Sequence, residues 1–144
     1  MTSPILIIGI GNPSRGDDAL GPLMIERLET LNLAGVELLT DFQLQVEYAL
    51  DLQGRRRVIF VDAAVNGPEP FSFEPVGPEQ DTSYSSHELS PAAVLHTCEK
   101  LYGPPPEARI LAIRGYRFDL GAPPSPAALA NLDAACRRLL AEIA

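Results

Sequence analysis

The stretch ILIIGIG at residues 5–11 decides the fold class, because a run of four aliphatic residues is ended by closely spaced glycines. A continuous apolar run bounded by glycine is typical of a strand buried on both faces of a parallel sheet. Residues 57–61 (RVIFV) and 110–113 (ILAI) have the same character, and residues 36–40 predict a further strand. The proline-rich stretch 67–78 predicts an edge strand, since proline is tolerated best at sheet edges.

Segments with helical periodicity lie between these strands. Apolar residues at helical spacing predict a helix over residues 18–31 and a short helix around residues 46–50. The dipeptides Ser90-Pro91 and Ser125-Pro126 each predict the start of a later helix, because serine is a favoured N-cap and proline suits the first helical position. We expect the helix after Ser90 to turn Leu101 toward the core.

Strands that alternate with helices predict an α/β fold. We expect a three-layer sandwich, with a largely parallel twisted sheet of about five strands and helices on both faces, in a single domain over residues 1–144. In such sheets ligands bind beyond the carboxyl ends of the strands, where the strand order switches. This rule directs attention to the residues that follow Gly9, Thr40 and Val61.

The charge balance of the chain excludes several classes of function. Eleven Lys and Arg against 19 Asp and Glu leave a net charge of −8, which argues against nucleic-acid binding. No apolar run approaches the ~20 residues of a membrane span, and no secretory signal is recognisable. Two cysteines are too few for a disulfide scaffold. We therefore expect a soluble, cytoplasmic protein. We also expect a monomer, and we interpret the run Arg55–Arg57 as solvated rather than as a docking patch.

The glycine-rich turn at residues 9–18 (GIGNPSRGDD) suggests dinucleotide binding, but Ser14 replaces the third glycine of that motif. Asp17 and Asp18 would also repel a pyrophosphate at the helix N-terminus. We expect Asp17 to cap the helix. Asp18 has two interpretations, as a partner of the helix dipole or as a ligand directed into the cleft.

Two further residues are candidates for chemistry. Asp62 is the first charged residue after an apolar strand, where it either caps a turn or serves the site. His87 lies in a polar loop before a helix cap, whereas His96 is interpreted as a surface or boundary residue. Together Asp18, Asp62 and His87 offer two carboxylates and an imidazole, a donor set suited to zinc or nickel with open coordination positions.

At this point three motifs, in this order and spacing, resemble those of the [NiFe]-hydrogenase maturation endopeptidases. They are GIGN at 9–12 followed by Asp17-Asp18, VIFVDA at 58–63, and SHELSP at 86–91. The stretches 42–47 (FQLQVE) and 118–121 (FDLG) resemble the branch that serves cytoplasmic bidirectional NAD(P)-linked hydrogenases.

The resemblance implies an endopeptidase that removes the C-terminal extension of a hydrogenase large-subunit precursor after nickel has been inserted. The catalytic and metal-contacting positions of the family map onto Asp18, Asp62 and His87, and many members have Glu at the position of Asp18. The nickel is implied to be supplied by the precursor, with zinc or cadmium able to substitute.

Three alternatives stay open on the sequence. One is a maturation chaperone that recognises the nickel-loaded precursor without cutting it. Another is a peptidyl-tRNA-hydrolase-like enzyme, which shares the Gly-Asn-Pro opening but would need a histidine shortly after Pro13. The third is a nucleotide-binding module in which Asp41 contacts a ribose.

Overall fold

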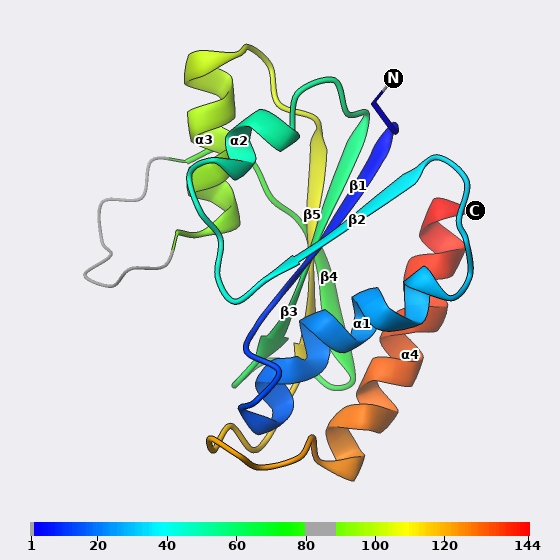
Figure 1. The fold of residues 1–144 in the computed structure, drawn as a ribbon. Coiled ribbons are helices and arrows are strands. Elements are labelled where there is room, and N and C mark those ends of the chain that lie inside the picture. Colours follow the sequence, from blue (N-terminus) through cyan, green and yellow to red (C-terminus); the bar gives the residue numbers. More distant parts are fainter. Residues whose placement is uncertain (1, 80–88) are drawn as a thin grey trace.

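The computed structural model describes residues 2–79 and 89–144. A five-stranded sheet is covered by helices on both faces (Figure 1), which confirms the predicted α/β sandwich. In chain order the elements are β1 (Ile5–Ile10), the 3-10 helix η1 (Gly16–Ala19), α1 (Leu20–Glu29), β2 (Val36–Asp41), α2 (Tyr48–Asp51), β3 (Arg57–Ala64), β4 (Phe71–Pro75), α3 (Pro91–Leu101), β5 (Glu107–Arg114) and α4 (Pro126–Ile143).

The strand order β2-β1-β3-β5-β4 places a switch point at the middle of the sheet. All neighbouring strands are parallel except β4, the predicted edge strand, which is antiparallel to β5. The chain leaves β1 for β2 on one side and returns to β3 on the other, so the order reverses between β1 and β3. Because Gly9 pairs with Val61, Asp62 follows the last residue of β3 that pairs with β1 and lies at this switch point.

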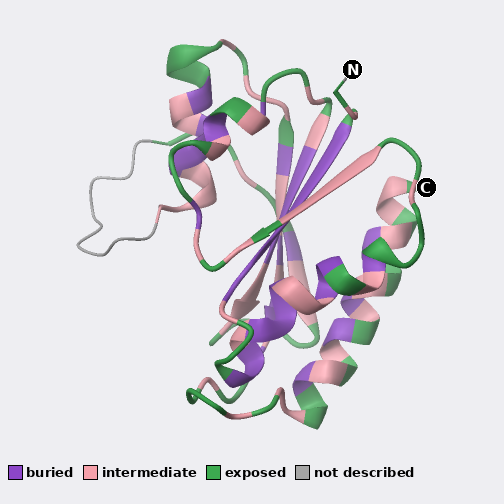
Figure 2. Ribbon diagram, viewed as in Figure 1, coloured by how far each residue is buried: buried purple, intermediate pink, exposed green. Residues whose placement is uncertain are grey.

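Each face of the sheet has its own core. Ile7 and Ile59 pack in the cluster that includes α1 and α4, and Ile8 and Phe60 pack in the cluster that includes α2 and α3. All four side chains are fully buried. Figure 2 shows β1 buried along its length while β2, at the sheet edge, is only partly buried. Burial on both faces explains the uninterrupted apolar run of β1.

The helix boundaries follow the predicted caps. The hydroxyls of Ser90 and Ser125 accept hydrogen bonds from the amides of Ala93 and Ala128, as expected of N-caps. The prediction that Leu101 faces inward is wrong, because its side chain is 66% exposed. Leu101 is the last residue of α3, and the buried residues of this helix end at Cys98, one turn earlier. Among the described residues, no helix is long and apolar enough to cross a membrane.

Arginine side chains connect segments at the amino edge of the sheet, where the parallel strands begin. The prediction that the run Arg55–Arg57 is solvated is wrong for Arg55, whose side chain is only 4% exposed. Its guanidinium donates to the carbonyls of Asp51 and Ser3 at 2.8 and 2.9 Å, and to Oε1 of Glu37 at 2.6 Å. Arg55 thereby ties the N-terminal segment and β2 to the connection that precedes β3.

Candidate functional site

Asp18 is held beside the end of β1 by the glycine-rich turn. Its Oδ2 accepts a hydrogen bond of 2.7 Å from the backbone amide of Asn12. A Cβ atom at Gly11, which has φ of +147°, would lie 1.9 Å from the carbonyl oxygen of Asp18. Only glycine permits this close contact between the two backbones, so the turn fixes where η1 and its Asp18 carboxylate lie.

Asp62 lies within β3, which continues to Ala64, rather than after the strand. Strand alternation places it on the α2 and α3 face, beyond Phe60. Its Oδ1 accepts a hydrogen bond of 2.8 Å from the Ala63 amide. Asp62 also lines a small cavity of about 40 Å³ together with Ile10, Gln43, Leu44, Leu89 and Pro91.

The structure brings Asp18 and Asp62 to the same end of β1. Ile10 lines the cavity of Asp62, and Asn12, two residues later, binds Asp18. The 3-10 helix η1 that carries Asp18 also packs against β3. Two carboxylates that lie far apart in the sequence therefore both reach the carboxyl edge of the sheet at its switch point.

His87, the third member of the predicted set, lies outside the described residues. Leu89 and Pro91, which follow it closely in the sequence, line the Asp62 cavity. Within residues 2–79 and 89–144, no three His, Cys, Asp or Glu side chains are grouped to hold a metal ion. The three-residue site stays a prediction that rests on the two carboxylates described above.

Asp17 does not cap its helix, contrary to the prediction. It is fully buried, and its carboxylate accepts hydrogen bonds from the amides of Tyr116, Arg117 and Ser125 at 2.7, 3.0 and 2.6 Å. The hydroxyl of Ser125 adds a fourth bond at 2.8 Å. Burial raises the pKa of Asp17, but these hydrogen bonds outweigh burial and hold the pKa below its ordinary value of 3.8. A 3-10 turn directs neighbouring side chains about 120° apart, which is why Asp17 faces inward while Asp18 faces the glycine turn.

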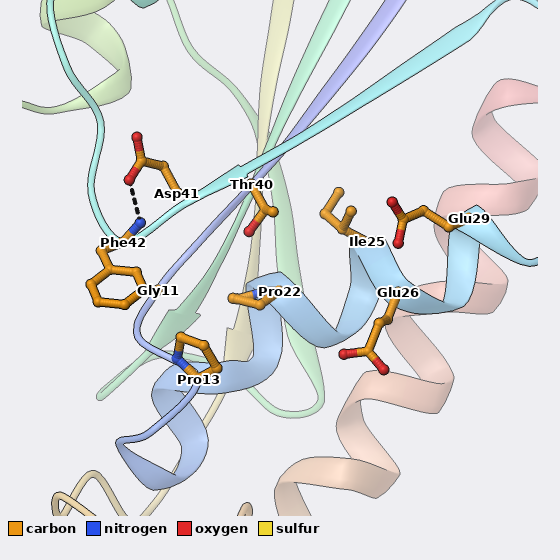
Figure 3. A pocket seen from close by; sticks show the side chains of 9 residues that line it. All are labelled: Gly11, Pro13, Pro22, Ile25, Glu26, Glu29, Thr40, Asp41 and Phe42. Carbon is orange, nitrogen blue, oxygen red and sulfur yellow. Dashed lines mark hydrogen bonds between the residues drawn. The ribbon is translucent and has the colours of Figure 1, made fainter.

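A groove of about 370 Å³ begins beside the glycine turn and continues between α1 and the end of β2 (Figure 3). We call it the α1–β2 groove. Neither Glu26 nor Glu29, on its α1 wall, forms a hydrogen bond or ion pair within the described part of the chain. The groove was not predicted from the sequence. The available signal was the i, i+3 spacing of the two glutamates, which places them on one side of a helix. The lining residues are Gly11, Pro13, Pro22, Ile25, Glu26, Glu29, Thr40, Asp41 and Phe42.

The same geometry argues against nucleotide binding. The Asn12 amide, which a phosphate would need, is bound by Asp18 instead. The Asp41 carboxylate, the candidate ribose contact, accepts hydrogen bonds from the Phe42 amide at 2.7 Å and the Tyr48 hydroxyl at 2.8 Å. Burial and this bond to Asp41 raise the pKa of Tyr48 to about 12, so its hydroxyl stays a donor. Both positions that would hold a nucleotide are therefore occupied by the chain itself.

Comparison with known proteins concerns the fold of the whole chain. No family model and no curated protein sequence matches the chain. Solved structures do match over nearly the whole chain. The hydrogenase maturating endopeptidase HybD from E. coli is 24% identical, with a TM-score of 0.78 over 99% of this chain and 92% of that chain.

Archaeal structures match as well. The [NiFe] hydrogenase maturation protease HycI from Thermococcus kodakarensis KOD1 is 28% identical, with a TM-score of 0.74 over 98% of this chain and 92% of that chain. The hydrogenase 2 maturation peptidase from Thaumarchaeota archaeon SCGC_AB-539-E09 is 20% identical, with a TM-score of 0.70 over 96% of this chain and 97% of that chain. The chain thus has the fold of these three proteins. The predicted enzyme class agrees with that of the Thermococcus kodakarensis protease.

Proposed function

We propose that this protein is an endopeptidase that removes the C-terminal extension of a [NiFe]-hydrogenase large-subunit precursor once nickel has been inserted. The observation that carries the proposal is the placement of Asp18 and Asp62 at the switch point of the sheet. Ligands bind at this place in open α/β sheets. The fold that surrounds the two carboxylates is shared with maturation proteases over almost their full length.

The nickel in this proposal belongs to the substrate. Bound to cysteines of the precursor, it would complete its coordination with Asp18, Asp62 and His87 and thereby hold the C-terminal extension in the cleft. Oxygen and imidazole nitrogen are suitable ligands for nickel. Hydrolysis of the peptide bond then needs a water molecule, which a carboxylate at this edge can deprotonate as a general base.

The α1–β2 groove supports a polypeptide substrate. It includes Gly11, and the neighbouring Asn12 amide holds Asp18, so a chain lying in the groove passes beside the candidate site. Its apolar wall includes Phe42, whose side chain is 61% exposed. The sequence around Phe42 resembles the branch for NAD(P)-linked bidirectional hydrogenases, and we propose the large-subunit precursor of such an enzyme as the substrate.

The test is cleavage of the purified, nickel-loaded precursor, followed as loss of its C-terminal peptide. We expect Asp62→Ala and His87→Ala to remain folded and to lose at least about 100-fold in cleavage rate, because each removes a group that acts on the substrate. Asp119→Asn is the matched control, since this carboxylate is exposed and its partner among the described residues is Arg117. Normal cleavage by both alanine variants would refute the site. Binding of the precursor by the wild-type protein without peptide release would identify a chaperone instead.

A further inference from the structure

The buried Asp17 carboxylate joins two connections of the chain at the carboxyl edge. Its hydrogen-bond donors all belong to residues 116–125, between β5 and α4. Hydrogen bonds also run between the two backbones, since the Asp17 amide donates to the Arg117 carbonyl at 2.7 Å and the Gly16 amide donates to the Ala122 carbonyl at 3.0 Å. In the other direction, the Gly121 amide donates to the Ser14 carbonyl at 2.7 Å. Residues 14–17 and 116–125 therefore form one hydrogen-bonded unit.

Steric contacts leave this unit little freedom. Gly16 has φ of +55°, and a Cβ atom there would lie 2.4 Å from the Arg117 carbonyl oxygen. A Cβ atom at Gly115 would lie 2.8 Å from Cβ of Asp17. The two connections approach each other so closely that η1 cannot move without breaking the hydrogen bonds of Asp17.

Asp18 shares this restraint because it is the next residue of η1. Its carboxylate is held on the opposite side by the Asn12 amide at 2.7 Å. The aspartate pair thus fixes η1 from two directions, with Asp17 bound to the β5–α4 connection and Asp18 bound to the glycine turn. The Asn12 amide reports directly on the place of Asp18, since it donates to that carboxylate.

We propose that Asp17 is a positioning residue, which holds Asp18 in its working place by anchoring η1 to residues 116–125. The inference rests on the proposed function of Asp18 as a group that contacts the substrate. Groups that act on a substrate must be held within about 0.5 Å of their productive place. A displacement of about 1 Å lowers the rate by about 100-fold.

The test compares Asp17→Asn with Leu139→Ala. The asparagine has nearly the same shape but presents an amide N–H₂ where one carboxylate oxygen accepts hydrogen bonds. Leu139 is fully buried near the C-terminal end of α4, so its truncation lowers the stability of the fold and leaves the hydrogen-bond donors of Asp17 and Asp18 in place. In Asp17→Asn we expect the Asn12 amide to exchange its hydrogen about 10-fold faster or more, and kcat/KM for the nickel-loaded precursor to fall by about 10- to 100-fold. In Leu139→Ala both quantities should stay at their wild-type values.

A second variant keeps the test decisive if Asp17→Asn does not fold. Ser125→Ala removes the hydroxyl donor, together with the N-cap acceptor of α4, and retains the three backbone donors. We expect the same changes at a smaller size, with Leu139→Ala as the control for lost stability. Asn12 exchange at the wild-type rate, or cleavage with the wild-type kcat/KM, would overturn the proposal. If the wild-type protein fails to cleave the precursor at all, the proposed function is wrong, and Asn12 exchange alone then decides whether Asp17 positions Asp18.

Discussion

The two edges of the sheet hold their charged side chains by different means. At the amino edge, Arg55 pairs with Glu37 at 2.6 Å and Arg57 lies 3.7 Å from Glu142. At the carboxyl edge, Asp17 and Asp18 accept hydrogen bonds from backbone amides and a serine hydroxyl. Neither forms an ion pair within the described part of the chain.

The ion pairs make the amino edge a structural one, whereas the carboxyl edge retains the negative charge of its aspartates. An ion pair cancels the charge of its members, whereas an amide or hydroxyl donor stabilises a carboxylate and leaves its negative charge in place. Glu26 adds negative charge on the α1 wall of the neighbouring α1–β2 groove, and Glu29 lies three residues further along the helix. A fixed negative potential at this edge attracts cationic groups and metal ions.

The largest effect on stability is expected at the carboxyl edge. Asp17→Ala should lower the free energy of unfolding by about 3 kcal/mol or more, because it leaves buried donors from Tyr116, Arg117 and Ser125 without an acceptor. Denaturant unfolding of the variant measures this loss. A loss below about 1 kcal/mol would mean that water replaces the carboxylate, and the contrast between the edges would fail.

At the amino edge, Arg55→Ala should cost about 2 kcal/mol, since three hydrogen bonds of a buried guanidinium are lost. Precursor cleavage by this variant should remain at the wild-type rate. Glu37→Ala is the control, with an expected cost below about 1 kcal/mol because the Glu37 side chain is 42% exposed. A loss of activity in the folded Arg55→Ala variant would show that the amino edge also serves the reaction.

A smaller effect is expected from protonation of Asp17, which should lower the stability of the fold at acid pH. The pKa of Asp17 in the folded protein lies below its ordinary value of 3.8, so the folded state favours the ionised form. Its contribution is complete above pH 3.8 and is lost as the pH falls through the folded pKa. The effect is smaller than that of Asp17→Ala, because a protonated carboxyl still accepts hydrogen bonds.

Unfolding measured from about pH 6 to about pH 2 checks this dependence. The loss of stability on acidification should be smaller in Asp17→Asn than in the wild type. Equal losses in the two proteins would assign the acid sensitivity to other carboxylates.

The smallest effect on stability is expected in the α1–β2 groove. Thr40→Trp places a large ring on the exposed wall of the groove and should change the free energy of unfolding by less than about 0.5 kcal/mol. KM for the precursor should rise, because the ring occupies the space in which we place the substrate chain. Thr40→Ser is the matched control. An unchanged KM in Thr40→Trp would exclude the groove as a substrate site and restrict recognition to the region around Asp62.

Part of the site could be predicted because it depends on local patterns. An apolar strand that ends in glycine or aspartate marks the carboxyl edge of a buried sheet, and this singled out Asp18 and Asp62. The same reasoning failed for Asp17, because the donors that bind it are about 100 residues away in the sequence. It failed for Arg55 for the same reason, since its partners Ser3 and Glu37 come from other segments.

The sequence by itself determined the elements of this protein and the class of its fold. Hydrophobic period, serine caps and proline positions are local signals that act within a few residues, and they identified all five strands and the capped helices. Tertiary structure alone decided the order of the strands, the placement of both carboxylates at the carboxyl edge near the end of β1, and which aspartate of the adjacent pair is buried. The physical reason is that these features depend on which distant segments pack together, and no local pattern encodes that choice.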